Sequence, residues 1–201
     1  GHGGTLRALA GSGLLSTLRR QGIEHLSYFQ VDNPLVRALD PVFLGLHSGD
    51  AVSSGEVTSK AVAKRSADEK VGVFGVQDGQ LTVLEYSDLD PEVCEATDAH
   101  GKLKFRAGNM AVHAFGLDFL DRLTKGTGLP FHRAIKRVPF FDEPTGTVQD
   151  PPAPNAVKYE TFIFDALPLA TRPLVVEADR AEEFAPIKNA EGSDSVQTSQ
   201  R

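Results

Sequence analysis

The chain has 201 residues, of which 40% are hydrophobic and 24% charged, values typical of a globular domain that can bury a core. The formal net charge of −6 argues against a nucleic-acid-binding surface, and the sequence shows neither an apolar run of membrane-spanning length nor a signal peptide. The single Cys94 excludes an intramolecular disulfide framework. We therefore expect a cytoplasmic protein without nucleic-acid or membrane partners.

The chain opens on the glycine-rich word Gly1-His2-Gly3-Gly4. Glycines in such words permit positive φ or a close approach of the backbone to a ligand. The word lacks the strand that usually precedes it, so we expect an internal piece of a longer protein; the alternative is a purification-tag remnant. Apolar residues at three- and four-residue steps predict a helix over 5–21, and Gly22 ends it.

The next apolar run, 23–31, predicts a strand that stops at Asp32-Asn33-Pro34. Pro34 cannot donate to a sheet ladder and pushes Asn33 towards extended geometry. In an open α/β sheet, ligands bind outside the carboxyl ends of the strands, where a carboxylate can hold a divalent metal on a nucleotide phosphate. Asp32 is therefore either a metal ligand or the cap of a turn.

Beyond this point strand-like and helix-like segments interleave, and Asp78-Gly79 is a strong hairpin signal. Further strands are predicted at 56–62, 71–76, 81–86, 105–115, 131–139 and 174–177. Helices are predicted at 35–45, 116–124, 158–167 and 180–184, and 88–98 is either a short helix or a loop. Segment 141–155 is expected to be a loop. Residues 1–190 then form one α/β domain, a mixed sheet with a hairpin insertion, and 191–201 form a polar tail that is frayed or truncated.

Several words stand in an order that resembles the UDP-sugar pyrophosphorylases, above all those specific for UDP-N-acetylglucosamine. These words are Gly1-His2-Gly3-Gly4, Val31-Asp32-Asn33, Val83-Leu84-Glu85-Tyr86-Ser87-Asp88, Ala107-Gly108-Asn109 with His113, 154–165, and Pro186-Ile187-Lys188-Asn189-Ala190. The resemblance implies a Rossmann-like (GT-A-like) nucleotidyltransferase fold. It also implies the reaction of UTP with a sugar 1-phosphate to give a UDP-sugar and pyrophosphate, with Mg²⁺ as cofactor.

The family's glycine-rich signature, Leu-x-x-Gly-Gly-x-Gly-Thr-Arg-Leu-Gly, does not occur in this sequence. In the family it precedes the point where this chain begins, together with a glutamine that recognises uracil and a phosphate-binding lysine. The resemblance therefore implies a domain truncated at its N-terminus. We expect such a piece to be inactive on its own, and the sequence does not indicate an oligomeric state.

On the nucleotide side, the resemblance implies that Gly1 helps to hold the uracil and that Asp32 contacts Mg²⁺ and UTP. His2 stands where eukaryotic members usually carry Asn, and its imidazole can still donate to a sugar or ribose oxygen. The alternative for His2 is an exposed loop residue.

On the sugar side, the matching residues are Glu85 and Tyr86, with Gly72 on the facing strand and Asn109 on a third segment. A carboxylate at a strand end can accept hydrogen bonds from two hexose hydroxyls, and Asn109 can donate to a hydroxyl or an acetamido carbonyl. The alternatives are a bulge or close strand packing for Gly72 and a turn for Asn109.

Two lysines are the phosphate candidates. The resemblance implies that Lys158 faces the UTP phosphates and that Lys188 is the catalytic lysine, next to the sugar phosphate and the reacting centre. Solvated surface charges are the alternative for both. Phe162 and Phe164 either wall an acetamido pocket or pack in the core.

The choice of sugar stays open between N-acetylglucosamine 1-phosphate and glucose or galactose 1-phosphate. A different class of function is a non-catalytic module that binds a sugar nucleotide. Cys94, His25, His47, His100 and His132 are assigned no role.

Overall fold

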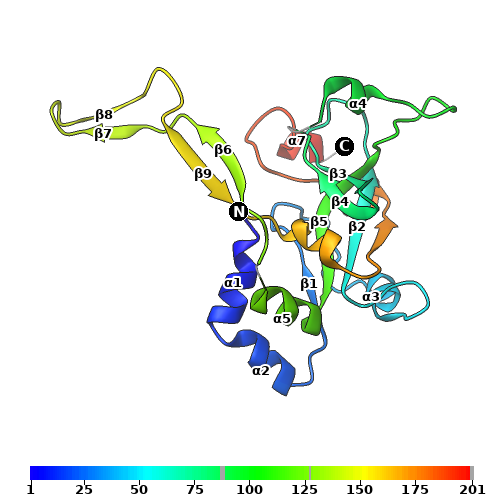
Figure 1. The fold of residues 1–201 in the computed structure, drawn as a ribbon. Coiled ribbons are helices and arrows are strands. Elements are labelled where there is room, and N and C mark those ends of the chain that lie inside the picture. The colour runs from blue at the N-terminus through cyan, green and yellow to red at the C-terminus, as the bar shows by residue number, and fades with distance from the viewer. Residues whose placement is uncertain (87–88, 127, 200–201) are drawn as a thin grey trace.

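The computed structural model describes residues 1–86, 89–126 and 128–199, and its centre is a six-stranded sheet in the order β10-β2-β5-β3-β4, with β1 also paired to β5 (Figure 1). The strands of this sheet are β1 (His25–Tyr28), β2 (Val57–Ala63), β3 (Val73–Gln77), β4 (Gln80–Leu84), β5 (Ala107–Gly116) and β10 (Leu174–Glu177). Only β10 runs parallel to its neighbour, so the predicted mixed sheet is confirmed. The hairpin at Asp78-Gly79 is confirmed as well, with φ of 52° and 79° at its two turn residues.

Strand β5 organises the sheet. It pairs with β2 along one edge, while β1 and β3 share its other edge at opposite ends. Tyr28 lies opposite His113 at one end, and Val73 lies opposite Gly108 at the other. The ends of β1 and β3 therefore both lie against β5.

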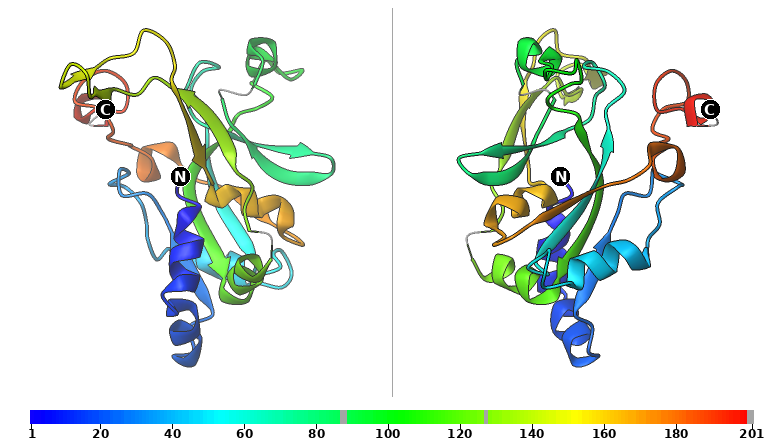
Figure 2. Two further views of the ribbon diagram at one scale, coloured as in Figure 1. Left: turned by 60° about the vertical axis from the view of Figure 1, so that its left-hand side comes forward. Right: turned by 90° about the vertical axis from the view of Figure 1, so that its right-hand side faces the viewer.

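Helices cover both faces of the sheet (Figure 2). One face carries α1 (Gly4–Gly11), α2 (Leu14–Arg20), α5 (Leu117–Lys125) and the 3₁₀ helix η1 (Ile163–Leu169), which pack around Phe115 and Leu167. The other face carries α3 (Pro41–Ser48) and the segment after α6 (Arg180–Glu183), which pack around Val112. The short helices α4 (Pro91–Glu95) and α7 (Val196–Ser199) lie outside both cores.

Two long predicted elements are wrong at the N-terminal end. The helix expected over 5–21 is two helices, because Gly13 adopts a left-handed φ of 70° and breaks it. The strand expected over 23–31 ends already at Tyr28, and the chain then turns, with the Asn33 N–H donating to the Gln30 carbonyl at 3.5 Å. Asp32 therefore lies in this turn.

A two-stranded arm, 131–160, projects from the body (Figures 1 and 2). Its stem is β6 (His132–Lys136) paired with β9 (Ala156–Glu160), and its tip is β7 (Phe140–Asp142) paired with β8 (Thr147–Gln149). The loop expected over 141–155 is thus partly a hairpin. The helix expected over 158–167 is wrong, since 156–160 pairs with β6 and only η1 follows.

The polar tail also differs from the expectation of a frayed end. Its described part, 191–199, contains α7, and Ser195 is buried. The backbone N–H groups of Lys188 and Asn189 both donate to the Asp194 carbonyl, at 2.7 and 2.9 Å. These bonds hold the tail against the segment that carries Lys188.

A buried lysine joins the second face of the sheet to two helices. The Lys60 side chain is only 3% exposed and contacts the carboxylates of Asp40, at 2.6 Å, and Glu183. Burial alone would raise the pKa of Asp40, but hydrogen bonds from Lys60 and from the α3 N–H groups outweigh it and lower that pKa. Removing one partner would leave a charge buried without compensation.

Buried neutral histidines predict a loss of stability in acid. His47 is fully buried with its Nδ1 2.9 Å from Thr58 Oγ1, and burial, followed by the proximity of His25, lowers its pKa to about 4. Below about pH 6.5 His47 is protonated in the unfolded chain but stays neutral in the folded protein. The free energy of unfolding therefore falls by about 1.4 kcal/mol per pH unit because of this group. We expect this fall to extend from about pH 6.5 down to pH 4.

Urea unfolding at pH 7.5 and pH 5.0 measures the effect. The variant His47→Gln should show a pH-dependent loss smaller than that of the parent by about 2 kcal/mol. The exposed His100 offers the matched control, and His100→Gln should keep the loss of the parent chain. An unchanged pH dependence in His47→Gln would contradict the assignment.

Candidate functional site

The N-terminal glycines lie directly against the backbone of Thr161. The Gly3 N–H donates to the Thr161 carbonyl at 2.8 Å. A Cβ added to Gly1 would lie 2.3 Å from the same carbonyl oxygen, and one added to Gly3 would lie 2.6 Å from Thr161 Oγ1. Neither position can carry a side chain without moving the backbone, which accounts for the glycines on either side of His2.

His2 is thereby held in an aromatic cluster. Its ring centroid lies 5.2 Å from that of Phe162, 5.5 Å from that of Phe164 and 6.2 Å from that of Tyr28. The Ile163 N–H donates to His2 Nδ1 at 3.1 Å, so the neutral ring carries its proton on Nε2. Burial lowers the pKa of His2, which keeps the ring a neutral donor. His2 is half-buried here, unlike the exposed loop residue of the alternative interpretation.

Phe162 and Phe164 pack against the core, which is one of the two roles considered for them; the acetamido pocket stays a prediction. Their rings stack on one another at 5.1 Å, and Phe164 belongs to the buried core. Phe162 also contacts the His132 ring at 4.7 Å, and His132 Nε2 lies 2.8 Å from Asp165 Oδ2. Burial raises the pKa of Asp165. The base of the arm is therefore fixed to η1 beside His2.

Behind His2 lies a polar group of residues that sequence reasoning did not single out. Tyr28 stacks on His113 with a centroid distance of 5.9 Å and an interplanar angle of 29°. His113 is fully buried, its Nδ1 lies 2.8 Å from Ser59 Oγ, and burial, followed by the proximity of His2, lowers its pKa to about 3. The only sequence signal was His113 as a member of a motif.

Tyr28 connects this group to Asp32. Burial raises the pKa of the Tyr28 hydroxyl, and the negative charge of Asp32 raises it further. The phenol is therefore a hydrogen-bond donor at neutral pH. Tyr28 belongs to no recognisable motif, so the sequence alone does not indicate that it lies near this site.

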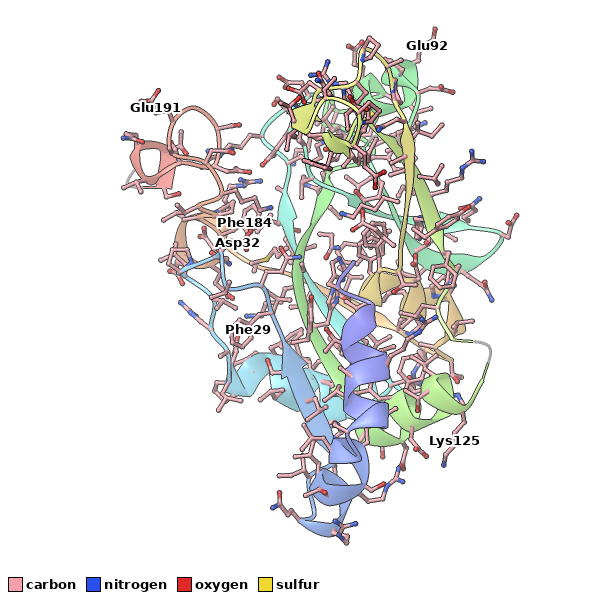
Figure 3. All side chains as sticks on the ribbon, turned by 90° about the vertical axis from the view of Figure 1, so that its left-hand side faces the viewer. Phe29, Asp32, Glu92, Lys125, Phe184 and Glu191 are labelled. Carbon is pink, nitrogen blue, oxygen red and sulfur yellow. The ribbon has the colours of Figure 1, made fainter. Side chains whose placement is uncertain are left out.

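Asp32 and Lys188, far apart in sequence, lie side by side. Lys188 Nζ is 3.5 Å from Asp32 Oδ2, and the Ile187 N–H donates to the Asp32 carbonyl at 2.8 Å. The neighbouring Asn33 is buried, donates through Nδ2 to the Glu183 carbonyl and accepts from the Ala185 N–H. Figure 3 accordingly shows Asp32 beside Phe184. The contacts of Asn33 thus hold the two segments together.

The donor set at Asp32 limits what metal it can hold. No group of three or more His, Cys, Asp or Glu side chains among residues 1–86, 89–126 and 128–199 is placed to bind an ion. Mg²⁺ is usually held by one or two carboxylates together with phosphate oxygens and water. A lone Asp32 carboxylate fits that mode, and it does not fit a cage made of protein ligands alone.

A second cluster brings Gly72, Glu85 and Asn109 together. The Asn109 N–H donates to the Gly72 carbonyl at 2.7 Å. A Cβ on Gly72 would lie 2.9 Å from Val83 Cγ1 and 3.1 Å from Glu85 Oε1, so the close strand packing of the alternative interpretation is present. Tyr86 follows with 43% exposure, whereas Ser87 and Asp88 of the same word lie outside the described residues.

Asn109 sits next to an irregularity in β5. The register between β2 and β5 shifts between Ser59 and Ala61, and Ala111 adopts a φ of 56°, which costs a non-glycine residue energy. Asn109 Oδ1 accepts the Ala111 N–H at 2.9 Å and so stabilises the bulge. The turn role considered for Asn109 is thus real, and its Nδ2 is left as the donor of the side chain.

Lys158 lies apart from the Asp32–Lys188 pair. It stands on β9, with Nζ 3.0 Å from Glu160 Oε1, and the Gly1 nitrogen lies 3.3 Å from the same oxygen. The hydrogen bond from Lys158 is the main reason for the lowered pKa of Glu160. Lys158 therefore flanks the glycine-rich word.

None of the described helices is long and apolar enough to cross a membrane.

Comparison with known proteins links this geometry to a family. The family described as UTP–glucose-1-phosphate uridylyltransferase (UDPGP) matches residues 1–197. The UDP-N-acetylglucosamine pyrophosphorylase of Saccharomyces cerevisiae is 40% identical over 99% of this chain, which covers 42% of that protein. The chain thus spans about two fifths of the length of the curated relatives it matches, 39% and 42% in two cases.

Two solved structures have the same fold. The Entamoeba histolytica protein assigned as a UDP-N-acetylglucosamine pyrophosphorylase superposes with a TM-score of 0.86 at 33% identity, over 100% of this chain and 49% of that one. The UDP-N-acetylglucosamine pyrophosphorylase of Trypanosoma brucei, solved with an inhibitor, has a TM-score of 0.76 at 29% identity, over 94% and 36% of the two chains. The nucleotidyltransferase-like fold expected from the sequence is confirmed.

The glycine contacts with Thr161 give a matched pair of variants. Gly3→Ala should lower the free energy of unfolding by about 1–3 kcal/mol, because the new methyl group overlaps Thr161. Gly4→Ala is the control, since a Cβ there meets nothing within 4 Å and alanine favours the helix that Gly4 begins. We expect Gly4→Ala to be stabilising by about 0.5–1 kcal/mol in urea unfolding. Equal effects of the two substitutions would contradict the packing argument.

Proposed function

Because the chain belongs to the UTP–glucose-1-phosphate uridylyltransferase family, we propose that it supplies the sugar-nucleotide-binding part of a uridylyltransferase. The reaction joins UTP and N-acetylglucosamine 1-phosphate to give UDP-N-acetylglucosamine and pyrophosphate. The names and identities of the relatives support this sugar. Absence of a membrane-spanning helix among the described residues and the lack of a disulfide framework support a cytoplasmic location.

The reacting centre is proposed at the Asp32–Lys188 pair, whose 3.5 Å approach is the observation that carries the proposal. An oxygen of the sugar 1-phosphate attacks the α-phosphorus of UTP in line, and the bond to the pyrophosphate oxygen breaks. Negative charge is spread over the phosphate oxygens in the transition state, so a cation fixed beside them lowers the barrier. Lys188 is the proposed catalytic cation, and the salt bridge to Asp32 orients it before substrate binds.

Asp32 is also the proposed ligand of Mg²⁺, with phosphate oxygens and water as the remaining ligands. When bound, Mg²⁺ would neutralise phosphate charge and hold the triphosphate in one geometry. The negative charge of Asp32 also acts on Tyr28, whose hydroxyl is held neutral by burial first and by Asp32 second.

The sugar is proposed to bind at Gly72, Glu85, Tyr86 and Asn109. Glu85 accepts hydrogen bonds from hexose hydroxyls, and Asn109 donates through Nδ2, because its Oδ1 is engaged by Ala111. A side chain at Gly72 would overlap Val83 and press on Glu85 Oε1, so glycine is proposed to be needed there for Glu85 to keep its position.

The nucleoside is proposed to bind along the glycine-rich word. Gly1 allows close approach to the uracil, and His2 Nε2–H donates to a ribose or sugar oxygen, since Nδ1 is held by Ile163. Lys158, beside Gly1 through Glu160, is proposed to contact the UTP phosphates. Phe162 and Phe164 hold the His2 ring in place for this contact.

Glucose 1-phosphate is the second candidate substrate, favoured by the description of the family as a whole. Galactose 1-phosphate belongs to the same test. Both hexoses lack the acetamido group, for which Asn109 Nδ2 is the proposed hydrogen-bond donor.

Activity of the full-length protein tests the proposal. Pyrophosphate release is measured with UTP, Mg²⁺ and each of the three sugar 1-phosphates, and N-acetylglucosamine 1-phosphate should give the highest kcat/KM. Asp32→Asn should lower kcat/KM by about 10²–10³, because the metal ligand and the orienting partner of Lys188 are both weakened. Asp50→Asn, the same change at an exposed position, should leave it unaltered.

Near-normal activity of Asp32→Asn would overturn the assignment of this residue. A full-length protein that binds UDP-N-acetylglucosamine in calorimetry but releases no pyrophosphate would instead identify a non-catalytic binding module. The 201-residue chain by itself is expected to release no pyrophosphate at an enzymatic rate, since the family's glycine-rich phosphate loop is not part of its sequence.

A further inference from the structure

The side chain of Arg180, at the start of α6, makes contacts in three directions. Its Nη2 lies 2.5 Å from Glu69 Oε1, and its Nε–H donates to the Ala63 carbonyl, at the end of β2, at 3.2 Å. Its guanidinium carbon lies 5.0 Å from the centroid of the Phe184 ring. Only 16% of the Arg180 side chain is exposed, so salt screens this ion pair less than one at the open surface. Arg180 therefore joins a loop, a strand end and the segment that follows α6.

Glu69 fixes the loop that leads to the proposed sugar side of the site. Its Oε1 is taken by the ion pair with α6, and its Oε2 accepts the Arg65 N–H at 2.8 Å. The Glu69 carbonyl accepts the Val71 N–H at 2.9 Å, which closes a tight turn directly before Gly72. The Gly72 carbonyl in turn accepts the Asn109 N–H at 2.7 Å. The edge at which the sugar is proposed to bind is therefore tied to α6.

The Phe184 ring, over which the guanidinium lies, begins the segment that carries Lys188. The ring packs against the apolar core on the second face of the sheet, and Figure 3 shows this residue beside the loop that holds Asp32. The next residue, Ala185, donates its N–H to Asn33 Oδ1 at 3.1 Å. Position 186 is a proline, which fixes its own φ and restricts the residue before it. The backbone between the ring and Lys188 is therefore short and stiff.

The position of Lys188 depends more on its backbone than on its side chain. The Lys188 N–H donates to the Asp194 carbonyl at 2.7 Å, and the Ile187 N–H donates to the Asp32 carbonyl at 2.8 Å. The Lys188 side chain is 50% exposed, with Nζ 3.5 Å from Asp32 Oδ2. A half-exposed salt bridge at this distance holds a lysine only weakly. Displacement of the segment that begins at Phe184 would therefore displace the Lys188 ammonium group.

We propose that Arg180 is a positioning residue for Lys188, and that its ion pair with Glu69 sets the distance between the sugar side of the site and the reacting centre. Arg180 itself does not touch the substrate, since it acts through the Phe184 ring and the backbone of 184–188. An arginine suits this place because one planar guanidinium serves a carboxylate, a carbonyl and an aromatic ring together. The inference rests on the proposed function, of which the role of Lys188 is a part.

Steady-state kinetics of the full-length protein with UTP, Mg²⁺ and N-acetylglucosamine 1-phosphate test the proposal. Arg180→Gln should lower kcat at least about tenfold and leave KM for UTP within about twofold, because a catalytic group misplaced by about 1 Å can cost about 10² in rate. Glu69→Gln should lower kcat in the same way, and the double variant should be no worse than Arg180→Gln alone. Arg180→Lys, which keeps a charge beside Glu69, should lose less than Arg180→Gln.

Hydrogen exchange of the full-length protein, followed by mass spectrometry, supplies a readout that does not depend on turnover. The hydrogen bonds donated by Ala185, Ile187 and Lys188 hold the segment in place. In Arg180→Gln the amides of 185–188 should exchange at least about tenfold faster than in the parent protein, because this segment opens locally. The amides of β5 should exchange as before, which separates a local release from a loss of overall stability.

Arg37→Gln is the matched control. Arg37 Nη2 lies 2.6 Å from Glu182 Oε2 and so binds the same helix, but the two side chains are 52% and 61% exposed. Exposed ion pairs of this kind contribute little. Arg37→Gln should therefore keep kcat within about twofold of the parent and leave the exchange of 185–188 unchanged.

Two results would overturn the inference in a protein that turns over. The first is a normal kcat in Arg180→Gln, whether or not exchange is faster. The second is a loss of kcat without faster exchange of 185–188, because Arg180 would then act without releasing Lys188. If Arg180→Gln does not fold, Arg180→Lys and Glu69→Gln decide by the same two measurements. A parent protein that binds the substrates but releases no pyrophosphate would instead refute the proposed function, and the positioning role would fall with it.

Discussion

The close approach of the Gly1–Gly3 backbone to Thr161 is the contact on which the candidate site depends. The bond from Gly3 to the Thr161 carbonyl, at 2.8 Å, joins the first residues of the chain to the segment between β9 and η1. Only glycine tolerates this spacing, and the consequence is that His2 is placed among Phe162, Phe164 and Tyr28. The same segment carries Glu160 and hence the partner of Lys158. One backbone contact thus gathers the residues proposed to bind the nucleoside from two segments that lie far apart in the sequence.

The bulge in β5 has the corresponding effect on the residues proposed to bind the sugar. In a regular strand Asn109 would be held by its ladder bonds alone, whereas here its side-chain oxygen also accepts the Ala111 N–H at the bulge. The bond from the Asn109 N–H to Gly72 then fixes the edge against which Glu85 lies. Since β5 also carries His113 under Tyr28, one strand supports both halves of the site. The backbone strain at Ala111 is offset by the hydrogen bond from its N–H to Asn109 Oδ1.

Alternating apolar patterns and turn chemistry were sufficient to predict the sheet strands and the Asp78-Gly79 hairpin, because these depend on local sequence. The helix predicted over 158–167 failed for the opposite reason: pairing with β6, more than twenty residues away, overrides local propensity. Motif order brought Asp32 and Lys188 to attention, but their approach depends on the buried Asn33 amide. Tyr28 and Ser59 carry no motif, and only the cross-strand register places them under His2.

Two histidines buried in the sheet stay uncharged at neutral pH. Thr58 and Ser59 are consecutive on β2 and point to opposite faces, and each holds a buried histidine by Nδ1, His47 on one face and His113 on the other. Both rings are kept neutral by burial, which lowers their pKa to about 4 and about 3. Asp32 forms a salt bridge with Lys188, and Lys158 forms one with Glu160. The proposed triphosphate would therefore meet two neutral donors, the Tyr28 hydroxyl and His2 Nε2–H. Its negative charge would be balanced by Lys158, by Lys188 and by any metal ion bound with it.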